Sequence, residues 1–231
     1  MNSIWSKTSE PVGFEPLKES KSADVLIIGG GLTGLLCAYM LKNAGVDCIL
    51  AEAGRICSGI TRNTTAKITL AHGLLYDKLI KRFGQEPARL YLEAQLRAAE
   101  HYACLCKEIP CDYESKDSYV YSLDDRKKIE REIEALNRLG VPAEFSETPL
   151  LPIRTAGAVC VRNQAQFHPL KFAFALAKEL PVYENTKVQE LLPGKAITQY
   201  GEITFRKAIV ATHFPILNKH GGYFLKLYQH R

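Results

Sequence analysis

The feature that most constrains the fold of this chain is a glycine-rich turn between an apolar strand and an apolar helix. Residues 24–28 form a short β-branched run that ends at Gly29, which is typical of a buried parallel strand. Leucines recur at helical spacing over residues 32–41, and residues 46–51 form a second apolar strand that closes at Glu52. Strand, helix and strand within about thirty residues make a βαβ unit. An α/β fold is therefore predicted.

The turn itself, Gly29-Gly-Gly31-Leu-Thr-Gly34, satisfies G-x-G-x-x-G. Gly29 permits a tight turn, Gly31 lets the main chain approach a pyrophosphate, and Gly34 lets the helix lie close to the strand. The start of the helix offers N–H groups and a positive dipole end to phosphates. Glu52 is placed to accept a hydrogen bond from an adenosine ribose hydroxyl. Together these features predict a dinucleotide site.

The residues after Glu52 indicate which dinucleotide is bound. NAD and FAD are held by the same βαβ unit, but in the nicotinamide form the chain normally continues with another βα unit. Here residues 53–69 are rich in Gly, Ser and Thr, which is typical of an ordered loop. This favours FAD, with a nicotinamide-dependent dehydrogenase as the alternative.

Several segments carry a resemblance to a known family. DVLIIGGGLTGLLCAYML with Glu52 and Arg55 is shared by many flavoproteins, whereas ITRNTTAKIT, NQAQFHPLKFAFALA and KAIVATHFP are narrower. With these segments the chain resembles the FAD-dependent oxidoreductases of the D-amino-acid-oxidase (DAO) type, in the glutathione-reductase-like superfamily. It is most similar to the subgroup fused to a C-terminal Rieske [2Fe–2S] domain. The resemblance runs from about Ser3 to the last residue.

The resemblance implies a role for each matching residue. Arg55 would lie near the adenosine and pyrophosphate, residues 59–66 along the ribityl chain and the isoalloxazine edge, and Val188 beside the adenine. Ala211 and Thr212 match the turn that closes the dinucleotide domain, where His213 replaces the usual glycine. The expected cofactor-binding residues are Gly29, Gly31, Leu32, Thr33, Gly34, Glu52, Ala53, Arg55, Gly59, Thr61, Asn63, Thr64, Thr65, Ala66, Val188, Ala211 and Thr212.

The resemblance also implies a fold and an activity. A Rossmann-like FAD-binding domain is expected over residues 1–110 and 165–215, with part of an α+β substrate domain over residues 111–164. The implied reaction is hydride transfer from a C–N bond of a small amine or amino acid to FAD. Because the cofactor supplies that chemistry, no catalytic acid or base is assigned. A non-catalytic dinucleotide-binding remnant is the alternative.

The end of the sequence leads to an expectation of truncation. Residues 216–231 match the start of a further C-terminal part, and the sequence contains no C-x-H paired with C-x-x-H that would hold a Rieske cluster. We therefore expect these residues alone to oxidise amines poorly. We also expect self-association through apolar surface around Tyr223, Phe224 and Leu227.

Composition excludes other classes of function. Of the 30 Lys and Arg, five lie from Arg206 onward, where there is no acid, so the preceding residues carry 25 bases and 25 acids. This gives little support for a nucleic-acid surface. No run reaches the roughly 18 apolar residues of a membrane span, and the polar N-terminus predicts a cytoplasmic protein. Cys104, Cys106 and Cys111 lack the spacing of a metal site, so no metal is expected.

Overall fold

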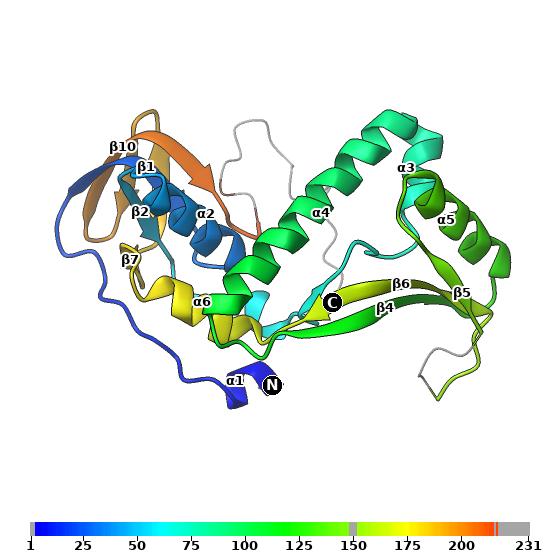
Figure 1. Ribbon diagram of the computed structural model, residues 1–231. Coiled ribbons are helices and arrows are strands. Elements are labelled where there is room, and N and C mark those ends of the chain that lie inside the picture. The colour runs from blue at the N-terminus through cyan, green and yellow to red at the C-terminus, as the bar shows by residue number, and fades with distance from the viewer. Residues whose placement is uncertain (1–2, 148–151, 215, 217–231) are drawn as a thin grey trace. The chain divides into compact units, whose positions relative to one another are not determined.

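The structure is a computed structural model that describes residues 3–147, 152–214 and 216. The chain forms two compact units. The first unit combines Met1–Thr64 with Pro169–Arg231, and the second unit is Thr65–His168 (Figure 1). The surface predicted around Tyr223, Phe224 and Leu227 lies outside the described residues.

The first unit is built on a six-stranded sheet with the order β7-β2-β1-β10-β9-β8. The first four strands in that order run parallel, and β9 and β8 continue the sheet antiparallel. The strands are β1 (Lys21–Ile28), β2 (Cys48–Ala51), β7 (Val182–Tyr183), β8 (Val188–Leu192), β9 (Lys195–Thr198) and β10 (Gly201–Val210). The predicted Rossmann-like α/β architecture is confirmed.

Both faces of β1 and β2 are buried along most of their length, which explains their unbroken apolar runs. On one face, Ile27 and Leu50 pack with Leu35 of helix α2 (Leu32–Asn43) and Ala173 of helix α6 (Pro169–Ala177). On the other face, Leu26 packs with residues of β2, β9 and β10. The short helices α1 (Ile4–Lys7) and η1 (Thr61–Asn63) complete the helices described in this unit.

The third long parallel strand differs from the sequence prediction. The sequence indicates two separate strands over residues 202–204 and 207–211, whereas the structure forms β10 as one strand that pairs with β1 from Ile203 to Val210. Arg206 and Lys207 are exposed, so these polar side chains interrupt the apolar pattern without breaking the hydrogen-bond ladder. Pairing with a distant strand sets the length of β10, and local periodicity does not reveal it.

The second unit combines an antiparallel sheet with three helices. Strand β6 (Gly157–Gln166) pairs with β3 (Lys67–Ile68), β4 (Glu114–Ser122) and β5 (Glu144–Ser146). The helices are α3 (Tyr76–Phe83), α4 (Gln85–Glu108) and α5 (Arg126–Arg138). These elements share a core in which helical residues meet apolar residues of β6.

The division into units differs from the domain boundaries expected from the sequence. The sequence predicts that residues 65–110 belong to the FAD-binding domain, whereas the structure groups them with the second unit. The reason is that Tyr76 of α3 and Leu92 of α4 belong to the same buried cluster as Leu136 of α5 and Val159 of β6. An amphipathic pattern predicts that a helix has a buried face, but it does not specify which sheet covers that face.

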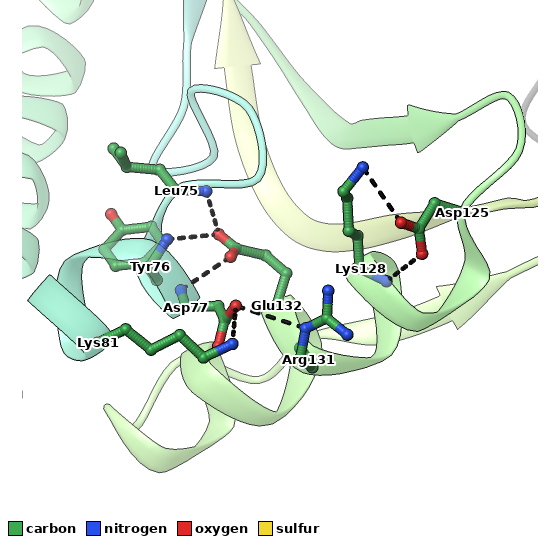
Figure 2. Close-up of polar contacts among 8 residues, drawn as sticks. All are labelled: Leu75, Tyr76, Asp77, Lys81, Asp125, Lys128, Arg131 and Glu132. Carbon is green, nitrogen blue, oxygen red and sulfur yellow. Dashed lines mark hydrogen bonds and ion pairs between the residues drawn. The ribbon is translucent and has the colours of Figure 1, made fainter.

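A buried carboxylate fixes the start of helix α3 (Figure 2). Glu132 of α5 accepts hydrogen bonds from the backbone N–H groups of Leu75 and Tyr76, both at 2.8 Å, and of Asp77 at 3.0 Å. Glu132 is only 2% exposed. The first N–H groups of a helix have no partner within the helix, and a negative charge there is favourable. This side chain therefore caps α3 from a different helix, three residues later than the start at Gly73 that the sequence predicts.

Glu132→Ala should destabilise the second unit by about 3 kcal/mol, because it leaves buried N–H groups without a charged acceptor. The measurement is denaturant unfolding of the full chain, with hydrogen exchange at the Tyr76 and Asp77 amides to localise the effect. Glu134→Ala is the matched control, since Glu134 lies on the same helix and is exposed; its effect should stay within about 0.5 kcal/mol. Equal losses for the two variants would contradict the capping role.

Candidate functional site

A cavity of about 780 Å³ lies in the first unit. Its wall contains the last residue of each of three parallel strands, Ile28 of β1, Ala51 of β2 and Val210 of β10. In open α/β sheets, ligands bind outside the carboxyl ends of the strands. The cavity therefore stands where the fold class places a ligand.

The glycine-rich turn forms one side of this cavity, and its glycines have different roles. Gly29 has φ +110°, and a Cβ there would lie 2.8 Å from the carbonyl oxygen of Ala211. A Cβ on Gly34 would overlap the carbonyl oxygen of Gly29, so Gly34 lies beneath the turn and does not line the cavity. At Gly31, by contrast, the nearest described atom to an added Cβ is Thr61 Oγ1 at 3.5 Å. Gly29 and Gly34 are thus required by the fold, and Gly31 keeps space open in the cavity.

Glu52 lines the cavity, and it also holds the turn together. Its Oε2 accepts a hydrogen bond from the N–H of Gly30 at 2.7 Å, and its Oε1 accepts one from the N–H of Gly54 at 2.8 Å. A carboxylate has about four lone-pair sites, so acceptor capacity remains on both oxygens. The sequence predicted a ligand contact for Glu52 and did not reveal this backbone role.

Arg55 also lines the cavity, and two distant segments hold its guanidinium. Its Nη2 donates to the carbonyl oxygen of Val12 at 3.1 Å, and its Nε lies 3.7 Å from Oε2 of Glu184. Glu184 is buried and follows the two-residue strand β7. The sequence does not reveal Glu184 as a site residue, because the strand before it is too short to show a periodic pattern.

The loop after β2 contributes a further part of the cavity wall and lies next to the glycine turn. Gly59, Thr61 and Thr64 line the cavity, and Thr61 Oγ1 accepts a hydrogen bond from the N–H of Leu32 at the start of α2, at 3.3 Å. Asn63 is exposed and instead donates from its amide to the carbonyl oxygen of Gly59 at 3.3 Å. The sequence identifies this loop by its composition, and the structure shows which of its side chains face the cavity.

Most of the predicted cofactor-binding residues come together around this one cavity. Those that line it are Gly29, Gly31, Leu32, Thr33, Glu52, Ala53, Arg55, Gly59, Thr61, Thr64, Val188, Ala211 and Thr212. Gly34 and Asn63 do not line it, and Thr65 and Ala66 belong to the second unit. Lining residues that the sequence did not single out as cofactor contacts include Gly30, Cys57, Ser58, Ile60, Lys187 and His213.

Among the residues that line the cavity, Cys57 has the pKa that is shifted most. Burial raises the pKa of its thiol to about 12, and its Sγ lies 3.6 Å from the carbonyl oxygen of Gly30. A buried thiol with a raised pKa stays protonated and is a poor nucleophile. Cys57 therefore suits packing against a bound molecule better than forming a covalent bond to it.

Membrane-spanning helices and clusters of metal ligands are both absent from the described part of the chain. Its helices are all too short or too polar to cross a bilayer. The same residues include no group of three or more His, Cys, Asp or Glu side chains arranged to hold a metal ion. Of the three clustered cysteines, Cys106 and Cys111 are buried and Cys104 is exposed.

Comparison with known proteins identifies relatives along nearly the whole chain. The chain is 33% identical over 240 aligned positions to the putative Rieske 2Fe-2S iron-sulfur protein YhfW of Bacillus subtilis (strain 168), covering 98% of this chain and 47% of that protein. It is 28% identical to gamma-glutamylputrescine oxidoreductase of Escherichia coli (strain K12), covering 86% and 50%. The chain thus spans about half the length of these curated relatives.

Solved structures share the fold. L-Proline dehydrogenase from P. horikoshii superposes with a TM-score of 0.68 at 21% identity, covering 84% of this chain and 53% of that one. Glycine oxidase from Geobacillus kaustophilus gives a TM-score of 0.63 at 18% identity, covering 83% and 55%. The family described as FAD dependent oxidoreductase (DAO) matches residues 24–226. With the βαβ turn and the cavity at the carboxyl ends of its strands, this chain belongs to the DAO family of FAD-dependent oxidoreductases.

Proposed function

We propose that the cavity of the first unit binds FAD without a covalent link, and that the protein oxidises a C–N bond of a small amine or amino acid. The observation that supports the binding site best is the convergence of the glycine turn, Glu52, Arg55 and the Thr61 loop on one cavity. When bound, FAD supplies the hydride acceptor for such an oxidation.

The cavity suits the pyrophosphate end of the cofactor. Gly31, Leu32 and Thr33 bring the N-terminus of α2 to its wall, where the helix dipole favours an anion. Arg55 adds a positive charge to the lining of the same cavity. The open space at Gly31 lets a phosphate approach the main chain closely, which a side chain at that position would prevent.

The remainder of the wall suits the rest of the molecule. Acceptor sites on Glu52 remain for ribose hydroxyls, and Ser58, Thr61 and Thr64 place hydroxyl groups where a polyol chain needs donors and acceptors. Val188 and Ala211 provide the apolar contacts expected beside a flat ring. In this arrangement the protein binds and orients the cofactor, and the 231 residues yield no assignment of a catalytic acid or base.

The proposed substrate class rests on the relatives. Gamma-glutamylputrescine oxidoreductase, L-proline dehydrogenase and glycine oxidase are all named for substrates that carry an amine or amino group. The structural neighbours by themselves establish the fold only. An amine or amino acid is therefore our proposal for this chain, and the members of the class have to be tested one by one.

We expect the purified chain to bind FAD and to release it on acid precipitation. Titration followed by flavin fluorescence measures the affinity, and NAD is the control ligand. Yellow colour that remains in the acid pellet would contradict non-covalent binding. Tighter binding of NAD than of FAD would overturn the cofactor assignment.

The flavin-loaded protein also tests the reaction. It is mixed anaerobically with a panel of amines and amino acids, and single-turnover loss of flavin colour is recorded, with 2-hydroxy acids as the control panel. Slow reduction by a C–N compound but not by its hydroxy analogue is the expected result, and rapid reduction would contradict the expectation that these residues alone oxidise amines poorly. Reduction only by hydroxy acids would reject the proposed substrate class, and tight FAD binding without reduction by any compound would favour a binding protein without catalysis.

A further inference from the structure

We propose that Glu184 is a positioning residue for the dinucleotide site: it orients Arg55 and fixes the backbone at Ile56 from a buried position outside the cavity. This inference rests on the proposed FAD site. Glu184 is 2% exposed and does not line the cavity, so any effect on a ligand is exerted through the residues that it holds.

The carboxylate of Glu184 joins three segments that are far apart in the sequence. Its Oε1 accepts a hydrogen bond from the N–H of Ile56 at 2.8 Å, and its Oε2 accepts one from the N–H of Phe14 at 3.2 Å. The same Oε2 lies 3.7 Å from Nε of Arg55. A buried carboxylate is costly unless it is both hydrogen-bonded and paired with a positive charge. Here both conditions are met, and the positive charge belongs to a residue of the cavity wall.

Two nitrogens of the Arg55 guanidinium thus have partners within the protein. Its side chain is 56% exposed, yet its Nε faces Glu184 and its Nη2 donates to Val12. A guanidinium has five N–H donors in a fixed plane, so further donors remain for a phosphate or ribose oxygen. Binding to a side chain that is already ordered costs less conformational entropy than ordering a free one.

The bond to Ile56 extends the effect to the glycine turn. The N–H of Cys57 donates to the carbonyl oxygen of Gly30 at 2.9 Å, and a Cβ on Gly30 would lie 2.8 Å from Cγ2 of Ile56. The backbone at Ile56 and Cys57 therefore lies directly against the turn that borders the cavity. A displacement of Ile56 would shift both Arg55 and this turn.

A neighbouring residue provides a matched control. Thr186 is fully buried and contacts the same N-terminal segment, because its Oγ1 accepts a hydrogen bond from the N–H of Leu17 at 3.0 Å. That hydroxyl donates to the carbonyl oxygen of Glu184 at 2.9 Å. Thr186→Val thus removes a buried polar contact of the segment without removing the carboxylate that faces Arg55 and Ile56.

The experiment measures FAD affinity and apo-protein melting temperature for Glu184→Gln, Thr186→Val, Arg55→Ala and the Arg55→Ala/Glu184→Gln pair. Glu184→Gln should weaken FAD binding about tenfold, and Thr186→Val by no more than about twofold. In the Arg55→Ala background, Glu184→Gln should weaken FAD binding by less than about a further twofold. The reason is that Arg55, through which Glu184 mainly acts on the ligand, is already absent. A purely structural role would lower the melting temperatures of Glu184→Gln and Thr186→Val alike and add its affinity loss to that of Arg55→Ala.

A second variant covers the case in which Glu184→Gln does not fold. Arg55→Lys leaves Glu184 in place and keeps the charge, but an ammonium lacks the planar fork that reaches both Val12 and Glu184. It should weaken FAD binding about tenfold with an unchanged melting temperature. Wild-type affinity in Arg55→Lys or Glu184→Gln would overturn the inference. A full tenfold loss from Glu184→Gln in the Arg55→Ala background would overturn the role of Glu184 in orienting Arg55 and leave only the Ile56 backbone. Failure of the wild-type chain itself to bind FAD would refute the proposed function, and this inference with it.

Discussion

Replacing Gly34 with alanine should destabilise the first unit by about 4 kcal/mol or more, which is at the extreme of single substitutions. A Cβ at this position would overlap the carbonyl oxygen of Gly29 and would lie 3.4 Å from Cγ2 of Ile27. The oxygen belongs to the backbone of a tight turn and cannot move aside as a flexible side chain can. Helix α2 would have to lift away from β1, with loss of the packing around Leu35 and Ala38.

The sole tryptophan reports on this unit. Trp5 packs against the core of the first unit and donates from Nε1 to the carbonyl oxygen of Thr64 at 2.8 Å. Denaturant unfolding followed by Trp5 fluorescence therefore measures the predicted loss. Gly59→Ala is the control, because a Cβ there would have no described atom within 4 Å. A wild-type unfolding midpoint for Gly34→Ala would show that α2 does not lie this close to the turn.

Gly31→Val should have the opposite effect to Gly34→Ala: the protein should fold but should no longer bind FAD. Gly31 has φ −81° and ψ −178°, an extended conformation that valine adopts readily. The nearest described atom to its Cβ would be Thr61 Oγ1 at 3.5 Å, an ordinary contact. The branched side chain would instead fill the space proposed for the pyrophosphate. We expect FAD affinity to fall about a hundredfold or more, equivalent to about 2.8 kcal/mol.

Two measurements on the same variant separate these effects. The free energy of unfolding, followed by Trp5 fluorescence, should change by less than about 1 kcal/mol, because Gly31 is the N-cap of α2 and an added Cβ there makes only an ordinary contact. The FAD titration, by contrast, should show the loss of affinity. Gly31→Ala, with a single methyl group, should give an intermediate affinity. Unchanged FAD binding by Gly31→Val would mean that the glycine serves the turn alone. Unfolding of the ligand-free variant would mean that the space at Gly31 is already occupied.

The sequence by itself determined the βαβ unit and most of the residues around the cavity. Local signals sufficed there, because the apolar strand, Gly29, helix α2 and Glu52 follow one another within a single short segment. The loop from Gly59 to Thr64 was found by its composition and its family resemblance. Val188, Ala211 and Thr212 are indicated by resemblance alone, since nothing in their local pattern shows that they line the same cavity as the glycine turn.

Only the tertiary structure decided which distant segments pack together and which backbone groups hold the buried carboxylates. Local pattern could not show that residues 65–110 pack with the second unit, because an amphipathic helix does not specify its partner. Nor could it distinguish Glu132 and Glu184, which are buried, from the many exposed acidic residues of the chain. Each of these carboxylates is held by backbone N–H groups more than forty positions away in the sequence. Such partners become neighbours only when the sheets and helices have assembled. The pattern of residues along the chain therefore does not show that they are close in space.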